Sequence, residues 1–335
     1  MTLTDRVMKL GKWLGLQTVS EYLAVASALL FMLVLLTGII LRVLFGTNVA
    51  LVWFGLVFGL CYFQVQKHGH RAFGYGPVPS NLKTEIKITN QNLDKIRIVC
   101  ISDTHNEHGG LEVPDGDILI HAGDFTKNGT LEEVVKFNTW LGKLPHQHKI
   151  IIAGNHDLVM DQDFYKKSWR KWHKKEGKQE LGDKDPRSLL TDCIYLENEA
   201  VDVEGLKFYG SPCSPHIPNY KEMAFNVRAS AKDRFETPTA TEVWDQIPEN
   251  TDILVTHTPP LGILDRLLLG KRVGCKSLRQ RIDQIKPRLH VFGHIHEDYG
   301  IHQDKETSTI FANASMVTML YTSKHKCLVI DLPRK

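Results

Sequence analysis

The feature that most constrains this fold is a set of five short apolar runs, each followed at once by polar side chains. The runs are IRIVCIS, DILIHAG, KIIIAG, DILVT and LHVFG, and they fall between residues 96 and 293. Short, nearly continuous runs rich in β-branched residues are typical of strands that are buried on both faces. The sequence therefore predicts an α/β domain built on such strands.

The segment between the second and third runs has the features of a helix. In TLEEVVKFNTWLGKLP, Thr130 and Glu133 have the spacing of a capping box, apolar residues recur at helical spacing, and Pro145 ends the pattern. A strand, a helix and a strand in succession indicate a mainly parallel sheet with covering helices. In such sheets, ligands bind beyond the carboxyl ends of the strands.

The polar residues that follow the runs are the candidate site residues, because each lies at a predicted carboxyl end. Asp103 and His105 alternate after the first run, and His294 and His296 alternate after the last. In extended backbone, residues i and i+2 point to the same side, so each pair is expected to point at one place. The full candidate set is Asp103, His105, Asp124, Asn155, His156, Asp157, His257, His294 and His296.

These residue types favour metal-assisted phosphoryl chemistry. Nitrogen and oxygen ligands without thiolate suit Mn²⁺, Fe or Zn²⁺ rather than Ca²⁺. Asp124 has two carboxylate oxygens and could bridge two ions. Such a pair, about 4 Å apart, can clamp a phosphate and deprotonate a bridging water, which then attacks phosphorus in line. We expect His156 to stabilise or protonate the departing oxygen, and Asp157 to orient His156.

The order D-x-H, GD, GNHD, H and GHxH resembles the calcineurin-like metallophosphoesterase superfamily, over roughly residues 95–333. The stretches FNTWLGKLP, THTPPLGILD and KPRLHVFGHIHEDYG are closer still to the metallophosphoesterase-domain-containing proteins of the brain type. This resemblance implies a four-layer αββα sandwich with a dimetal site at one edge.

The resemblance also implies a division of the ligands between two divalent ions, of which Mn²⁺ is the first expectation and Fe, Zn²⁺ or Mg²⁺ are alternatives. His156 would be the catalytic histidine. One ion would be held by Asp103, His105, Asp124 and His296, and the other by Asp124, Asn155, His257 and His294.

Further substrate contacts are expected beside this centre. Asn155 and His156 are the nearest candidates. His216, in the Pro-rich stretch 210–226, is a candidate contact for phosphate or base, with an ordinary surface histidine as the alternative. Arg272, in KRVGC, is a candidate for neutralising a phosphate, with an ordinary surface arginine as the alternative.

The chain opens with two long uncharged stretches, Tyr22–Leu41 and Val43–Gln66. Twenty helical residues span about 30 Å, the thickness of a bilayer core, so a transmembrane helical hairpin is predicted within 22–66. Both flanks are basic, which predicts that both ends and the catalytic domain face the cytosol. The alternative is a single span with the second stretch in the interface, which would place the catalytic domain across the membrane. The predicted organisation is 1–21 basic segment, 22–66 hairpin, 67–94 linker and 95–335 catalytic domain.

Charge limits the choice of partners. The formal net charge is only +3, and no long basic groove with interleaved aromatic residues is evident, so no nucleic-acid partner is expected. The charge-dense stretch 166–187 is expected to be a solvated helix and loop, and a phosphate-attracting flap is the alternative. The sequence does not specify an oligomeric state.

Together these features predict a membrane-anchored dimetal phosphodiesterase, with cyclic nucleotides as candidate substrates. The alternatives are a phosphomonoesterase that acts on a phosphoprotein, nucleotide or lipid headgroup, and a membrane scaffold that binds metal but turns over little.

Overall fold

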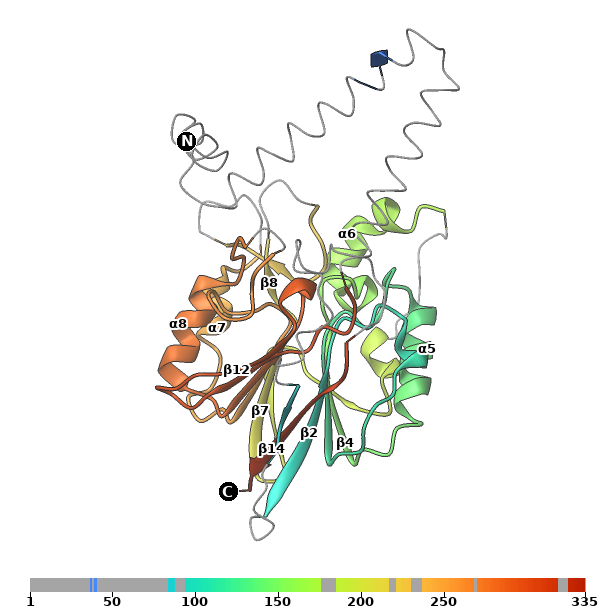
Figure 1. The fold of residues 1–335 in the computed structure, drawn as a ribbon. Coiled ribbons are helices and arrows are strands. Elements are labelled where there is room, and N and C mark those ends of the chain that lie inside the picture. The colour runs from blue at the N-terminus through green and yellow to red at the C-terminus, as the bar shows by residue number, and fades with distance from the viewer. Residues whose placement is uncertain are drawn as a thin grey trace, which may run out of the picture. The chain divides into compact units, whose positions relative to one another are not determined.

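The computed structural model describes residues 84–87, 94–175, 185–216, 221–229, 237–267, 270–318 and 325–334, together with Thr37, Ile39 and Ile40. The chain divides into two compact units, Met1–Pro77 and Val78–Lys335. The second unit contains both large sheets and the candidate site (Figure 1).

Two six-stranded sheets form the centre of this unit. The first has the order β1 (Glu85–Ile86), β14 (Leu328–Pro333), β2 (Lys95–Ile101), β3 (Ile118–Ala122), β4 (His148–Ile152) and β5 (Ile194–Tyr195). Only the β14–β2 pair is antiparallel within it.

The second sheet is also mixed, with its antiparallel pairs at the two edges. Its order is β12 (Gly300–Gln303), β13 (Ile310–Asn313), β11 (Leu289–Phe292), β10 (Ile253–Thr256), β7 (Leu206–Ser211) and β6 (Glu199–Val203). The β12–β13 and β6–β7 pairs are antiparallel, and the three inner pairs are parallel. A small parallel pair, β8 (Ser214–Pro215) with β9 (Asn226–Val227), lies outside both sheets.

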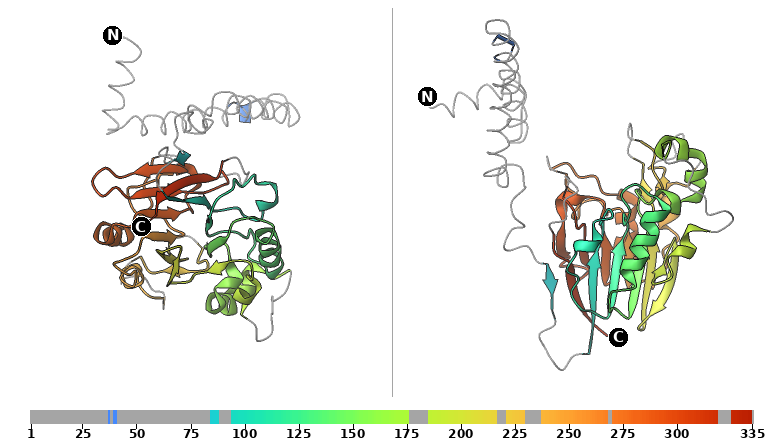
Figure 2. Two further views of the ribbon diagram at one scale, coloured as in Figure 1. Left: turned by 90° about the horizontal axis from the view of Figure 1, so that it is seen from below. Right: turned by 90° about the vertical axis from the view of Figure 1, so that its right-hand side faces the viewer.

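Helices cover the outer face of each sheet, as Figures 1 and 2 show. The first sheet is covered by α5 (Leu131–Leu141), with α6 (Gln162–Trp172) beyond the upper strand ends in Figure 1, and the second is covered by α7 (Ala240–Trp244) and α8 (Lys276–Ile285). Short 3-10 turns are η2 (His108–Gly110), η3 (Leu158–Met160), η4 (Pro186–Leu189) and η5 (His296–Asp298).

Three apolar clusters hold these layers together. One fills the space between the sheets, where Ile98, Ile120 and Val255 are fully buried. The second packs the first sheet against α5 and α6, and the third packs the second sheet against α7 and α8. The predicted α/β sandwich with helices outside two sheets is therefore confirmed. Because all three clusters lie within residues 86–332, we expect Val78–Lys335 to fold by itself.

The strands and the helix predicted from the sequence are present at the predicted places. All five apolar runs form strands, namely β2, β3, β4, β10 and β11. The predicted helix is α5, and its capping box is complete: the Thr130 side chain accepts from the Glu133 amide, and the Glu133 carboxylate accepts from the Thr130 amide. Of the linker expected at 67–94, residues 84–87 and 94 are described, and they include strand β1, which pairs with β14.

The predicted transmembrane hairpin lies almost wholly outside the described residues. Of residues 22–66, only Thr37, Ile39 and Ile40 are described, and they are helical. Within the described part of the chain, no helix is both long enough and apolar enough to cross a membrane.

Candidate metal centre

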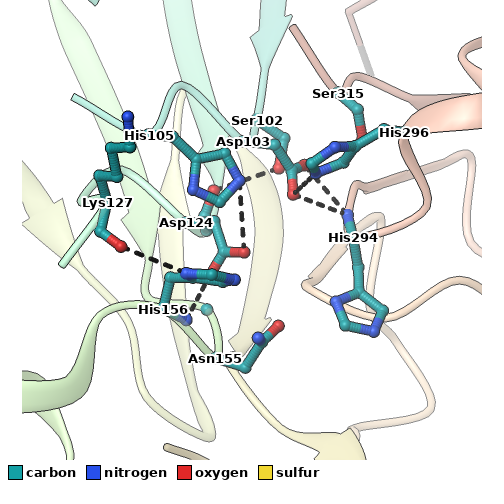
Figure 3. Close-up of polar contacts among 12 residues, drawn as sticks. Ser102, Asp103, His105, Asp124, Lys127, Asn155, His156, His294, His296 and Ser315 are labelled. Atoms are coloured by element: carbon teal, nitrogen blue, oxygen red, sulfur yellow. Dashed lines mark hydrogen bonds and ion pairs between the residues drawn. The ribbon is translucent and has the colours of Figure 1, made fainter. Parts of the chain in front are cut away.

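The strand ends converge as the parallel arrangement requires. Side chains that follow β2, β3, β4, β10 and β11 meet in one buried cluster, part of which is drawn in Figure 3. Within this cluster, three groups of ligand atoms lie within 4.8 Å of one another: Asp103, His105 and His296; His105, Asp124 and His156; and Asp124, His257 and His294.

Asp103 is the anchor of the first group. The His296 Nε2 lies 3.3 Å from one carboxylate oxygen of Asp103, and the Ser315 hydroxyl donates to the other at 2.9 Å. The backbone amide of His294 also donates to this carboxylate, at 3.0 Å. Asp103 is thus fixed by residues that lie about two hundred positions away in sequence.

Asp124 belongs to two of the three groups, as the predicted bridging role requires. Its Oδ2 lies 3.7 Å from His105 Nε2 and 3.4 Å from His257 Nε2. Its Oδ1 accepts from the backbone amide of His156 at 2.7 Å. This carboxylate therefore faces both halves of the cluster.

The two alternating pairs differ in outcome. Asp103 and His105 meet in one ligand group as expected, although through left-handed rather than extended backbone, whereas His294 and His296 separate. His294 has φ 68°, in the left-handed region, and His296 begins the 3-10 turn η5. His294 therefore joins the group around Asp124, whereas His296 joins the group around Asp103. This division matches the two ligand sets implied by the resemblance.

Left-handed backbone recurs at the ligand positions. Asp103, His105, Asp124 and His294 all have φ between 42° and 68°. For a residue with a side chain this conformation costs about 1–2 kcal/mol, and such strain is concentrated at functional sites. The left-handed backbone at these four positions therefore lowers the stability of the fold, and in return it directs the four side chains into the ligand cluster.

Two glycines permit the close approach of the ligand loops. Gly123 has φ 97°, and a Cβ there would lie 2.6 Å from both His257 Nδ1 and the Ala153 carbonyl oxygen. A Cβ at Gly293 would collide with the side chains of Asp103 and Ser102. At the positions directly before Asp124 and His294, any side chain would collide with residues of the site, so glycine is required there.

The electrostatics of the cluster suit a cation. Burial lowers the pKa of His105 to about 4 and that of His294 to about 3, so both imidazoles are neutral ligands at neutral pH. Burial also opposes charge on His257, but the carboxylate of Asp124 outweighs it and raises the pKa of His257 to about 9. Two buried carboxylates thus create a negative potential that favours positive charge at this point.

His156 lies at the open side of the cluster. Its backbone amide is bound by Asp124, and its Nδ1 lies 3.3 Å from the Lys127 carbonyl oxygen (Figure 3). The ring is within the second ligand group, 4.8 Å from the His105 ring between centroids. This position is compatible with contact to a bound phosphate.

Asp157 does not orient the His156 ring, contrary to the prediction. Its fully buried carboxylate accepts from the backbone amides of Asp124, Thr126 and Gly154 at 2.8–3.0 Å, and from the Thr126 hydroxyl at 2.6 Å. Burial and the charge of Asp124 raise the pKa of Asp157 to about 7. Asp157 joins the loop after β3 to the loop after β4.

Asn155 is placed where the predicted second ion requires it. Its Oδ1 lies 2.9 Å from His257 Nε2, and its Nδ2 lies 3.2 Å from the Met223 sulfur. His257 is fixed in turn by its Nδ1, which lies 2.9 Å from the Ala122 carbonyl oxygen. That contact leaves Nε2 facing Asn155 and Asp124.

The two outer substrate candidates are not part of the ligand groups. His216 follows β8, and its backbone amide donates to the Val227 carbonyl. The Arg272 guanidinium binds the buried carboxylate of Asp265 at 2.7 Å, and Asp265 also accepts from the amides of Gly262 and Gly274. Arg272 therefore holds the loop after β10 together, and its charge is already compensated.

Sequence reasoning missed two residues that position Asp103. Asn313 and Ser315 form a glycosylation-type triplet with Ala314, yet both are fully buried. The Asn313 side chain donates to the carbonyls of Leu264 and Ile295 and accepts from the backbone amide of Ser315, whose hydroxyl donates to Asp103. Asn313 ends strand β13 and Ser315 follows it, and this place at a strand end is the signal that could have identified them.

Two further buried histidines support the strands that lead to the site. His121 Nε2 lies 2.9 Å from the Thr104 hydroxyl, and His290 Nε2 lies 2.8 Å from the Thr256 hydroxyl. Neither Nδ1 has a hydrogen-bond partner within the described residues. Burial lowers the pKa of each imidazole to about 3, so both are neutral components of the core.

A pocket of about 280 Å³ adjoins the cluster at His156. It lies between the loop after β3, η3, α6 and the segment before β9. Its lining is Lys127, Asn128, Thr130, His156, Leu158, Trp172, His173 and Met223. This pocket provides room beside the ligand groups for part of an organic molecule.

The donor set fits a pair of divalent cations, because two buried carboxylates, an amide oxygen and several imidazoles converge without thiolate and Asp124 is shared. The fold and site thus define a metal-dependent phosphoesterase class. The model of the family described as calcineurin-like phosphoesterase matches residues 96–298. The chain belongs to this family, which implies a metal-dependent hydrolase of phosphoric esters.

Individual relatives agree with this assignment. The chain is 44% identical over 244 residues to "Metallophosphoesterase domain-containing protein 1" of Homo sapiens, covering 71% of each chain. The Mus musculus protein of that name matches to the same extent. A UPF0046 protein of Caenorhabditis elegans is 40% identical over 247 residues, covering 72% of this chain and 82% of the relative.

Proposed function

We propose that this chain is a phosphodiesterase that uses two divalent metal ions, Mn²⁺ foremost. The observation that carries the proposal is the sharing of Asp124 between two ligand groups, with His156 at their open side. When bound, the ions would supply charge neutralisation for the phosphate and an activated water.

The residues of the chain divide the remaining work. Asp103, His105 and His296 would hold one ion, and Asn155, His257 and His294 the other, with Asp124 common to both. His156 would contact a phosphate oxygen and stabilise or protonate the departing one. Asp157 keeps the loops of Asp124 and Asn155 in register through backbone amides.

Two observations favour a diester over a monoester. The pocket beside His156 can receive a second ester substituent, including the nucleoside part of a cyclic nucleotide. Arg272, the cation expected to neutralise a phosphate, is occupied by Asp265. A singly charged diester needs less compensation than a doubly charged monoester.

A substrate panel tests this proposal on residues 78–335. Rates are compared for bis-p-nitrophenyl phosphate, p-nitrophenyl phosphate, 2′,3′-cyclic AMP and 3′,5′-cyclic AMP, each with Mn²⁺ and with chelator. Metal-dependent preference for diesters supports the proposal. Preference for the monoester would favour a phosphatase, and absence of turnover with retained metal binding would favour a scaffold.

We further propose that residues 22–66 anchor the catalytic domain on the cytosolic side of a membrane. The support is the pair of uncharged stretches and their basic flanks. Protease treatment of sealed vesicles that contain the full chain with a C-terminal tag tests the topology. Digestion of the tag is expected, and a protected tag would refute the cytosolic placement.

A further inference from the structure

Helix α6 and the turn after it form a strongly basic surface. Between Phe164 and Lys175 there is no acidic residue. The six cationic side chains of this stretch are all exposed: Lys166, Lys167, Arg170, Lys171, Lys174 and Lys175. Asp163, at the start of the helix, lies 3.4 Å from Lys166, but both groups are largely solvated, so this pair compensates little.

Tryptophans lie among these cations, with cationic groups over their rings. The Arg170 guanidinium carbon is 4.7 Å from the centroid of the Trp169 ring, and the ammonium groups of Lys171 and Lys221 are 5.6 and 5.5 Å from that of Trp172. Both indoles also pack against the apolar cluster beneath α6. Stacked nucleic-acid bases would compete with these cations for the ring faces, which favours a partner that is bound by charge over one that is bound by base stacking.

The basic surface is joined to the pocket beside His156. Trp172 and His173 line that pocket. His173 is buried, and its two ring nitrogens lie 2.7 Å from the Tyr165 hydroxyl of α6 and 2.7 Å from the Asn128 carbonyl oxygen. A flat anionic surface that contacts α6 would therefore also lie close to the pocket.

We propose that the six cations of α6 and its following turn bind the anionic surface of a lipid bilayer. Flexible lysines around half-buried tryptophans are typical of interfacial helices, and spread point charges suit a headgroup layer better than one small anion. The predicted hairpin strengthens this choice, and in that respect the inference rests on the proposed function. The positive charge of α6 is an observation that does not depend on the predicted hairpin.

Vesicle sedimentation with residues 78–335, which lack the predicted hairpin, tests this surface without any turnover. Vesicles of phosphatidylcholine are compared with vesicles that also contain phosphatidylserine. Each basic side chain near such a surface contributes about fivefold to partitioning, so Lys167→Gln, Arg170→Gln and Lys171→Gln together should weaken binding about 100-fold. Added salt should release the unaltered protein.

A matched variant removes the same charge elsewhere. Lys276→Gln, Lys286→Gln and Lys305→Gln change exposed lysines of α8, its end and the β12–β13 turn, on the opposite side of the sandwich from α6 (Figure 1). This variant should bind within a few-fold of the unaltered protein, and thermal unfolding of both variants checks their folding.

Three results would overturn the proposal: equal binding to neutral vesicles, equal loss in the matched variant, or displacement from anionic vesicles by single-stranded RNA at equal phosphate concentration. The last result would assign the surface to nucleic acid. Vesicle binding is measured without substrate or metal. It can therefore be absent while diester hydrolysis persists, and it can be present while diester hydrolysis is absent.

Discussion

Replacement of Asp157 by asparagine provides the sharpest test of how the metal centre is held. One carboxylate oxygen accepts from the amide and hydroxyl of Thr126, and the other from the amides of Asp124 and Gly154. Asparagine has the same shape, but its NH₂ group must face at least one of these backbone donors. A buried donor left without an acceptor costs about 1–3 kcal/mol, and above the Asp157 pKa of about 7, where its carboxylate is ionised, charge-assisted hydrogen bonds are also lost.

We therefore expect Asp157→Asn to lower the free energy of unfolding by about 3 kcal/mol, or the Tm of a domain this size by about 6 °C. Because the released amides belong to the loops of Asp124 and Asn155, metal affinity should also fall, by about 10–100-fold. Thermal and urea unfolding of residues 78–335, with chelator and across a Mn²⁺ titration, measure both effects. Metal-dependent stabilisation reports the affinity directly.

Asp331→Asn is the matched control. Asp331 is also a buried carboxylate, but it binds the side chains of Lys95 and Arg97 near the opposite ends of the strands. Its loss should destabilise the domain without changing the gain in stability from Mn²⁺. The reasoning is refuted if Asp157→Asn is as stable as the unaltered protein, or if both variants respond to Mn²⁺ equally.

Three other predictions concern single positions. Asp124→Ala should lower kcat/KM for the diester at least about a thousandfold, or about 4 kcal/mol, and a near-normal rate would contradict the bridging role. Gly123→Ala should abolish Mn²⁺-dependent stabilisation, because its Cβ would collide with His257 and the Ala153 carbonyl; unchanged stabilisation in unfolding assays would exclude that clash. His290 stays neutral in the fold with a pKa of about 3, whereas its unfolded pKa is about 6.5, so stability falls as pH drops through this window. Between about pH 7 and pH 5, the free energy of unfolding should therefore fall by about 2 kcal/mol less in His290→Phe than in the unaltered protein, as measured by urea unfolding in chelator. An equal fall in both proteins would refute this prediction.

The sequence was sufficient to predict the strands and the convergence of their ends, because both depend on local patterns. Buried strands are continuous apolar runs, and parallel strands bring their carboxyl ends to one edge. The same reasoning could not predict how each side chain turns. His294 leaves extended geometry through a left-handed φ, and only the nearby Asp103 carboxylate, which accepts from its amide, explains this.

The orienting role predicted for Asp157 was wrong for a related reason, whereas phosphate neutralisation by Arg272 stays a prediction. Each is next to a motif in sequence, and adjacency suggested catalysis or phosphate binding. In the fold, Asp157 binds backbone amides of two loops, and Arg272 binds Asp265. Backbone donors carry no signal in the sequence, so charged residues that organise loops resemble charged residues that act on substrate.

For the stretch 166–187, the sequence pattern was compatible with two structures, and tertiary contacts now favour one of them for the described part. Its charge density alone suited a solvated helix or a phosphate-attracting flap. The described part up to Lys175 is mainly helix, and its cations are solvated as the first reading requires. Yet His173 ties this helix to the Asn128 carbonyl, and Lys127, the preceding residue, contacts His156 through its own carbonyl. Helix α6 is therefore connected to the candidate catalytic histidine through the loop that contains Lys127 and Asn128. A surface that binds the cations of α6 would lie close to the site. For this reason we assign these charges to recognition of an anionic surface and not to solubility alone.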